Sequence, residues 1–424
     1  MPTPQRGRFS YHVRQALFRF KLLSSKIRNM SKQSPHRKHW QLNPEVAFLN
    51  HGSFGATPTV VLRAQREFQD AMELDPIQFL APERELEPKL DRVRELLASL
   101  FGADAQDIAF VRNVTDGVSA VLRSFPFDTG DEIVITDHGY NACNNAAQFA
   151  ADRAGAIIRK ARLPYPVHDP DQVVAAIQRQ FTDRTRLLLV DHVTSPTGLV
   201  LPLQQIVTAA KSRGIQVMVD GAHAPGMLPL DLKSIDADYY TANHHKWLCG
   251  PKVSGFLWVH PERQQQVRPT IISHAANRER PGRSKFLAEF DWMGTFDPTP
   301  VLALESAINF LSNLMPGGLP QLMESNRNLA LQARDVLTQT LGIEPPAPAA
   351  MIANLVALPL PTNADINVIR QQMLSKYRIE APLFIGPSDA GPMIRTSSQA
   401  YNHISEFERL ADALPTILQS ATSS

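Results

Sequence analysis

From about residue 45 onward, short apolar runs alternate with longer windows in which apolar residues recur every three or four positions. The short runs are almost continuously apolar, which is typical of strands buried on both faces of a sheet. The longer windows, such as 140–154, 170–181 and 202–213, have the spacing of amphipathic helices. We therefore expect an α/β fold with a mostly parallel sheet covered by helices on both sides. The expected strands are 107–111, 131–136, 186–191, 215–220, 237–242 and 253–259.

The pattern also divides the chain. The last two expected strands are joined by a segment too short for a crossover helix, so we expect one antiparallel strand at an edge of the sheet. A helix is expected from about Pro300, and a longer one over 319–341 leads out of a large domain of residues 45–319. Residues 320–424 are expected to form a small α/β domain. Residues 45–70, although part of the large domain, are a segment that could also contact it.

Residues 1–44 differ from the rest of the chain in charge. They hold ten Lys and Arg residues and no acid, so the remainder carries 33 basic and 41 acidic residues. This mildly acidic body argues against a nucleic-acid partner. The segment 11–28 has amphipathic spacing typical of a membrane-surface helix or an organelle transit peptide. Because Met30 offers a second start, we instead favour a disordered extension outside the fold.

Composition narrows the class of protein further. The 424 residues can form more than one domain, and no run of 18 apolar residues suggests a membrane-spanning helix. Cys143 and Cys249 are the only cysteines and provide neither a disulfide framework nor a metal-binding spacing. We therefore expect no metal site and a reducing, cytoplasmic location.

Polar residues follow several expected strands at the edge where open α/β sheets bind ligands. Thr115 stands where a helix begins, and free N–H groups together with its hydroxyl suit a phosphate. Its simpler role is a helix N-cap. Asp220 ends an apolar strand, so its carboxylate is expected to be desolvated and to need a cation or a donor, or else to cap the next helix.

Lys246 follows in "HHKWLCGP", 26 residues after Asp220. Pyridoxal 5'-phosphate (PLP) chemistry requires these two groups: a lysine forms a Schiff base with the aldehyde, and an acid keeps the pyridine nitrogen protonated. A pocket of low dielectric lowers the lysine pKa and favours the imine. No GxGxxG follows the first strand, so the dinucleotide-binding fingerprint is absent.

Five motifs together resemble the class V aminotransferase fold: "RNVTDG", "DHVTSPTG", "VDGAHAPG", "HHKWLCGP" and "DWMGTFDPTP". The opening "FLNHGSFGATP" and the pair "DHGYNA" and "DWMGTFDP" resemble the isopenicillin N epimerase-like branch. The likeness covers about residues 45–415. It implies a PLP-dependent enzyme of fold type I, with a mostly parallel seven-stranded sheet, a small C-terminal domain and a homodimer with a composite active site.

The resemblance also implies roles for individual residues. Lys246 would carry the cofactor, Asp220 would pair with the pyridinium, and His223 would reach the ring hydroxyl side. His138 or Tyr140 would stack on the ring. Thr115, Asn243 and His245 would hold the phosphate, and Thr295 would reach the phosphate of the partner subunit. Asn113, Asp116, Asp191 and Ser195 complete the expected cofactor contacts. Substrate contacts are expected from Arg395, which would grip a carboxylate, and from His51 and Ser53.

The residues leave the reaction open. Epimerisation needs Lys246 on one face of Cα and Tyr140, His138 or His51 on the other. A carbon–sulfur β-lyase of the hercynylcysteine sulfoxide lyase kind, or an aminotransferase, needs Lys246 as the proton-transfer group. Desulfurases of this fold carry a cysteine shortly before the carboxylate-binding arginine, and 380–395 has none. A catalytically silent PLP-binding protein would have no need of Arg395.

Overall fold

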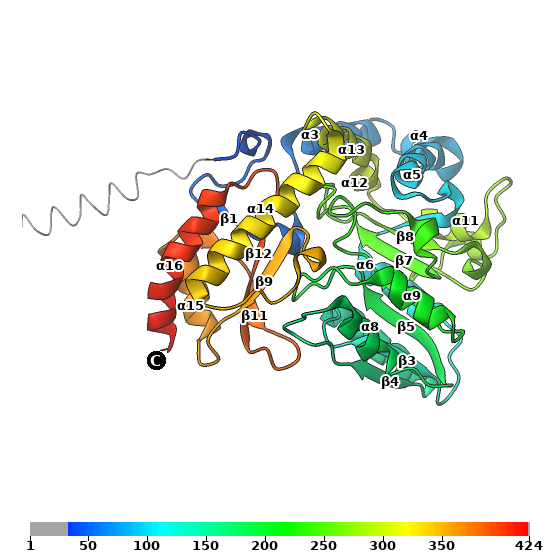
Figure 1. The fold of residues 1–424 in the computed structure, drawn as a ribbon. Helices are drawn as coiled ribbons and strands as arrows, with labels where there is room; N and C mark the ends of the chain where they lie inside the picture. The colour runs from blue at the N-terminus through cyan, green and yellow to red at the C-terminus, as the bar shows by residue number, and fades with distance from the viewer. Residues whose placement is uncertain (1–32, 423–424) are drawn as a thin grey trace, which may run out of the picture.

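A computed structural model describes residues 33–422, so the predicted helix at 11–28 lies outside the described residues. Its centre is a seven-stranded sheet with the order β2-β8-β7-β6-β5-β3-β4 (Figure 1). The strands are β2 (Ile108–Val111), β3 (Glu132–Thr136), β4 (Ile157–Ala161), β5 (Thr185–Asp191), β6 (Gln216–Asp220), β7 (Tyr239–Asn243) and β8 (Gly255–Val259).

Most neighbouring strands of this sheet run parallel, as predicted, but the antiparallel strand lies elsewhere than expected. β8 is antiparallel to both β7 and β2, so it is an internal strand and the expectation of an antiparallel edge was wrong. The edge strand β4 was not expected from the apolar pattern. Its residues Arg159 and Lys160 are polar and Ile157 is exposed, because an edge strand need not be apolar throughout.

Alternating side chains of each central strand enter two separate cores. Ile133 and Ile135 of β3 pack with one core, whereas Val134 between them packs with the other. This follows from the two-residue period of a strand. The first core is closed by α6 (Val114–Ser124), α7 (Asn141–Ala154) and α11 (Lys285–Asp291). The second is closed by α5 (Glu87–Phe101), α8 (Pro170–Gln178), α9 (Leu203–Lys211) and α10 (Leu232–Ile235).

The remaining helices lie before and after the sheet in the chain. α2 (His51–Phe54) is a single turn, and α3 (Thr59–Leu74) packs against the helices that follow the sheet. The predicted helix starting near Pro300 is two helices, and the predicted long helix at 319–341 is confirmed within one residue by α14. These elements are α4 (Pro76–Leu80), α12 (Thr299–Leu302), α13 (Leu304–Asn313) and α14 (Gly318–Leu341).

The C-terminal part contains a three-stranded antiparallel sheet with the order β11-β12-β9. Beside it, β1 (Ala47–Phe48) pairs in parallel with β10 (Ile379–Glu380), so residues near the start of the chain join this part. We propose residues 45–319 and 320–424 as the two domains. The elements are β9 (Leu355–Pro359), α15 (Ile366–Ser375), β11 (Leu383–Ile385), β12 (Pro392–Ser397) and α16 (Ile404–Thr422).

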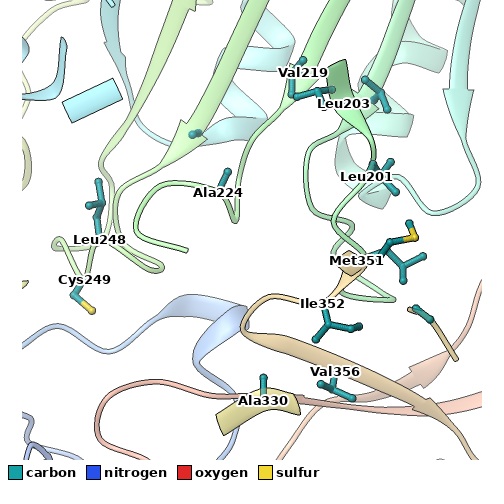
Figure 2. Packing of buried hydrophobic residues seen from close by; sticks show 14 of the residues in the cluster. Leu201, Leu203, Val219, Ala224, Leu248, Cys249, Ala330, Met351, Ile352 and Val356 are labelled. Atoms are coloured by element: carbon teal, nitrogen blue, oxygen red, sulfur yellow. The ribbon is translucent and has the colours of Figure 1, made fainter. Parts of the chain in front are cut away.

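The two parts share one continuous core. Figure 2 shows Leu201, which follows β5, next to Met351 of the C-terminal part, while Leu203 lies beside Val219 of β6; all of these residues belong to the same core. The Val200 N–H donates to the Met351 carbonyl at 2.9 Å, which adds a backbone bond to the apolar contact. The position of the C-terminal part relative to the sheet is therefore fixed by packing next to the strand ends.

Residues 33–44 belong to the folded body, contrary to the expectation that the extension reaches residue 44. Arg37 is buried and forms an ion pair with Glu406 of α16 at 3.4 Å. Trp40 is 5% exposed, donates its indole N–H to the Ala56 carbonyl at 3.0 Å, and packs against Tyr401. The basic composition of residues 1–44 gave no indication that Trp40 would be buried against Tyr401. No helix among residues 33–422 is long and apolar enough to cross a membrane.

Candidate active site

The predicted polar residues meet at the carboxyl ends of three adjacent strands. Asp191 of β5 lies opposite Asp220 of β6 in the parallel register, and Asn243 is the last residue of the next strand, β7. All three side chains are buried. Because parallel strands end at the same edge, the fold brings together residues that are far apart in the sequence.

Lys246 lies three residues beyond β7, in the loop that leads to β8, and it is buried. Its Nζ is 3.0 Å from His223 Nε2, while Trp247 Nε1 donates to His223 Nδ1 at 3.3 Å. Since Nδ1 accepts, a neutral His223 carries its proton on Nε2 and can donate to an unprotonated amine. Burial, with the charges of Lys246 and Arg395, holds the His223 pKa well below its ordinary value. Burial and the Arg395 charge lower the Lys246 pKa to about 8.

Two glycines allow other segments to approach this loop closely. Gly55 has φ of +69°, and a Cβ at this position would lie 1.8 Å from the His245 carbonyl oxygen. Gly226 has φ of +79°, and its Cβ would lie 2.5 Å from the backbone of Trp247. Both positions need the missing side chain as well as the left-handed backbone. They hold the loop around Lys246 against the start of the chain and the segment after β6.

Asp220 accepts two hydrogen bonds from within the protein. Its Oδ1 accepts from the Ala222 N–H at 2.9 Å, and its Oδ2 accepts from Cys143 Sγ at 3.2 Å. Burial raises the Asp220 pKa, and these two donors and the Lys246 charge oppose that shift. Burial and the Asp220 charge raise the pKa of the neighbouring Asp191 well above its ordinary value. Sequence reasoning did not assign Cys143 to the site; its place directly after "DHGYNA" was the available signal.

The N-terminus of α6 lies at the same edge of the sheet. Asn113, not Thr115, is its N-cap: Asn113 Oδ1 accepts from the Asp116 N–H at 3.0 Å. The Val114 N–H donates to Asn243 Oδ1 at 3.1 Å. Within residues 33–422, nothing accepts a hydrogen bond from the Thr115 N–H or hydroxyl. Thr115 therefore presents two donors beside Asn243, as a phosphate site requires.

The other predicted phosphate residues differ in their surroundings. His245 Nδ1 is buried without a partner in the described part of the chain. The Asp116 carboxylate accepts from the Thr270 hydroxyl at 2.7 Å and pairs with Arg112 at 3.2 Å, so it holds neighbouring segments in place. Thr295 is exposed in the segment between α11 and α12, so this chain does not fold it into its own site.

Arg395 lies in β12 and is 5% exposed. Its guanidinium donates to the Ser195 carbonyl, to Ser195 Oγ at 3.3 Å and to Ser53 Oγ at 3.3 Å. Ser195 thus contacts the arginine, where we had expected a contact to the cofactor ring. No carboxylate pairs with Arg395 anywhere in the described range. Burial lowers the Arg395 pKa to about 10, and a buried cation of this kind requires an anion.

The two ring-stacking candidates differ in exposure. His138 is fully buried, its Nδ1 is 2.8 Å from Thr197 Oγ1, and its Nε2 has no partner among residues 33–422. Thr197 was not predicted, although it lies in "DHVTSPTG". Tyr140 is 49% exposed. It lies close enough to Arg395 for its charge to raise the arginine pKa. His138 therefore has the buried position that ring stacking requires, and Tyr140 lies near Arg395, the residue predicted to bind a carboxylate.

His51 has a different position from the one expected of a substrate-binding residue. It is fully buried, with Nδ1 2.8 Å from the Tyr401 hydroxyl and Nε2 2.9 Å from the Lys246 carbonyl oxygen. The Ala56 N–H also donates to Nδ1, at 3.3 Å, so the proton of a neutral ring is on Nε2. Both nitrogens are thus used inside the protein. His51 connects the Lys246 loop to the C-terminal part through these two contacts.

The unpaired donors fit the group that the sequence implied. Thr115 and His245 suit a phosphate, the buried imidazole of His138 suits contact with an aromatic ring, and the Lys246 amine, whose pKa is lowered, suits an aldehyde. Asp220 is placed to accept from a ring nitrogen through the remaining lone pairs of its carboxylate. The donor set therefore fits PLP. The described residues contain no cluster of three or more metal-ligating side chains.

Comparisons with known proteins agree with this geometry. Residues 48–400 match the family described as Aminotransferase class-V. An isopenicillin N epimerase from Streptomyces clavuligerus is 36% identical over 386 residues, covering 88% of this chain and 95% of the relative. A probable chloroplastic L-cysteine desulfhydrase from Arabidopsis thaliana is 29% identical, covering 88% and 83%. The structure of the cysteine desulfurase CsdA from Escherichia coli superposes with a TM-score of 0.75 at 23% identity, covering 91% and 98%. The resemblance and the fold class predicted from sequence are confirmed.

Proposed function

Because the chain belongs to the class V aminotransferases, a family of enzymes whose cofactor is PLP, we propose that it inverts the configuration at Cα of an amino acid or an amino-acid derivative. The identity of 36% to isopenicillin N epimerases, over nearly the full length of those proteins, supports this reaction. The substrate of those relatives does not transfer with the fold, since side-chain pockets vary within one architecture.

The observation that carries the proposal is Arg395, a buried guanidinium without a carboxylate partner in the described residues. Its planar fork can bind the α-carboxylate of an amino acid through two parallel hydrogen bonds. The Arg395 charge lowers the Lys246 pKa, so the two groups share one electrostatic environment. A substrate held by Arg395 would thus place its Cα near the Lys246 amine, where a proton can be removed.

Inversion needs a proton-transfer group on each face of Cα. PLP, when bound, withdraws electrons from Cα and makes its proton acidic. Lys246 can move that proton on one face, since lowering its pKa to about 8 leaves about a tenth of the amine unprotonated at pH 7, far more than for an ordinary lysine. Tyr140 is the candidate for the other face, because its phenol lies near Arg395 and is half exposed. His51 is no longer a candidate, since both of its nitrogens are engaged.

We also propose a homodimer. Thr295 is exposed on a segment that also exposes Phe296, and the resemblance assigns Thr295 to the phosphate of a neighbouring subunit. A second copy would cover this segment and complete the site.

A second candidate reaction is β-elimination from a sulfur-containing amino acid. It is supported by the likeness to L-cysteine desulfhydrases at 27–29% identity. Both cysteines of the chain are buried, and the segment 386–391 before Arg395 carries none, so a persulfide relay lacks an acceptor. Elimination with release of free sulfide needs no such acceptor. Lys246 would remove the Cα proton in this reaction as well.

One screen separates these reactions. Purified protein with PLP is incubated with single amino acids and short amino-acid derivatives in heavy water. Deuterium at Cα together with the opposite enantiomer supports epimerisation. Pyruvate, ammonia and sulfide instead indicate β-elimination, and conversion of the cofactor to its amine form indicates transamination. If absorbance verifies that the cofactor is fully bound and none of the compounds tested shows Cα deuteration or inversion, the proposed function is contradicted.

Two substitutions test the assigned roles. Lys246→Ala should abolish the adduct trapped by borohydride, whereas Lys252→Ala should retain it. Lys252 is the matched control, because it lies in the same loop but contacts Thr57 at 3.3 Å. Tyr140→Phe should slow inversion by about a hundredfold or more while Cα deuteration with retained configuration continues. Inversion at the wild-type rate in Tyr140→Phe would remove Tyr140 from the mechanism.

A further inference from the structure

Cys143 is one of two buried cysteines, and it lies against the carboxylate that the cofactor ring requires. It is the third residue of α7, 2% exposed, and its Sγ is 3.2 Å from Asp220 Oδ2. The strand-end loop that carries His138 leads directly into this helix. The same short segment therefore provides the ring-stacking histidine and a contact to Asp220.

The two contacts of Asp220 act in the same direction. The Ala222 N–H donates to Oδ1, and the Cys143 thiol donates to Oδ2. An ionised carboxylate only accepts hydrogen bonds, so two donors favour the charged form of a buried acid. Burial and the Asp220 charge raise the thiol pKa well above its ordinary value, and the thiol therefore keeps its proton. Each oxygen retains further lone pairs, one of which can face a ring nitrogen.

We propose that Cys143 is a positioning residue for the PLP pyridine nitrogen, because its thiol fixes the orientation of the Asp220 carboxylate and favours its ionised form. The inference rests on the proposed use of PLP. Cys143 itself need not touch the cofactor. A thiol is a weak donor, so it stabilises the charge without holding the carboxylate as strongly as a hydroxyl would.

The test compares three variants of the full-length protein. Cys143→Ala removes the donor, Cys143→Ser replaces it with another donor, and Ala147→Gly is a control. Ala147 is buried one turn further along α7, and glycine there destabilises the helix without changing a contact to Asp220. Each protein is freed of PLP and titrated with it by absorbance, and each is melted without the cofactor.

Loss of one such hydrogen bond should weaken PLP binding about three- to tenfold in Cys143→Ala. Cys143→Ser should bind within about twofold of wild type, and Ala147→Gly should melt earlier but bind PLP with unchanged affinity. Wild-type affinity in Cys143→Ala would overturn the inference. So would equal weakening in the Ala and Ser variants, because packing would then explain the effect. If wild-type protein takes up no PLP, the proposed function itself fails.

Discussion

His51 offers a sharp test of how the site is held together. Its imidazole bridges the Lys246 carbonyl oxygen at 2.9 Å and the Tyr401 hydroxyl at 2.8 Å, and its ring lies 4.8 Å from that of Trp247. Burial lowers its pKa to about 3, so it is neutral near pH 7. The ring thus fixes the backbone of the lysine loop to the C-terminal part. We expect substitutions at His51 to act through stability and loop position.

The number of contacts that each His51 substitution removes determines how much the free energy of unfolding falls. His51→Ala removes two hydrogen bonds and leaves a cavity, so it should lower the free energy of unfolding by about 3–5 kcal/mol. His51→Gln can keep an amide N–H directed at the Lys246 carbonyl and loses mainly the contacts of Nδ1. It should cost about 1–2 kcal/mol at pH 7. In both variants, turnover of the folded fraction should fall less than in Lys246→Ala.

The pH dependence supplies a second readout. The folded-state pKa of about 3 lies below the ordinary value of 6.5, so the unfolded chain binds a proton that the folded chain excludes. This contribution to stability is complete above pH 6.5 and is lost as the pH falls towards 3. Between pH 7 and pH 5, wild type should lose about 2 kcal/mol more than His51→Gln, which lacks the titrating group.

Urea unfolding of wild type, His51→Gln and His51→Ala at pH 7 and pH 5 measures these differences. Other buried histidines, such as His192 and His244, also have lowered pKa values, but they are common to all three proteins and cancel. If His51→Gln unfolds like wild type at both pH values and yet has no turnover, then His51 acts on substrate. That outcome would falsify the positioning role and restore the role expected from sequence.

Two further changes test contacts at the rim of the site. Arg395→Lys loses the planar fork and should lower kcat/KM by about 10- to 100-fold, mainly through KM; an unchanged KM would mean that the carboxylate binds elsewhere. Ser388→Ala removes a hydroxyl that lies 2.5 Å from Asp137 Oδ2 and 2.6 Å from the Leu163 carbonyl, and so ties the 386–391 segment to the sheet domain. It should lower the free energy of unfolding by about 1 kcal/mol and speed proteolysis of that segment, and equal proteolysis rates would argue against the tie.

The fold was largely predictable because buried parallel strands have a strong apolar signal. The misplaced antiparallel strand shows the limit of that signal. Local spacing identifies β8, but β8 is internal only because β2, from much earlier in the chain, pairs with its other side. Trp40 shows a second limit. Its burial depends on Tyr401, some 360 residues further along the chain, so no local pattern could place residues 33–44 in the body.

The position of a site residue was predictable where the residue ends or closely follows a strand, as for Asp220 and Lys246. It was not predictable where two distant segments meet. Cys143 of α7 contacts Asp220 at the end of β6, and Ser195, in the segment after β5, contacts Arg395 of β12. For His51, the motif suggested contact with substrate, whereas in the folded protein both ring nitrogens contact other protein groups. A motif predicts which residues gather, and tertiary packing decides what each of them touches.

The charges of the site constrain its substrate more closely than the fold does. Lys246 lies near the buried carboxyl groups of Asp191 and Asp220 and near Arg395, and burial disfavours charge on all four groups. Asp220 already has its donors, so Arg395 is the charge left without a partner in the described structure. A ligand with an α-carboxylate would neutralise that cation, and its amine would lie near the Lys246 amine, whose lowered pKa makes it easier to deprotonate. A ligand with the amine alone would leave the guanidinium buried and unpaired, which costs several kcal/mol. We therefore expect the site to prefer α-amino acids over simple amines, whichever bond at Cα is finally broken.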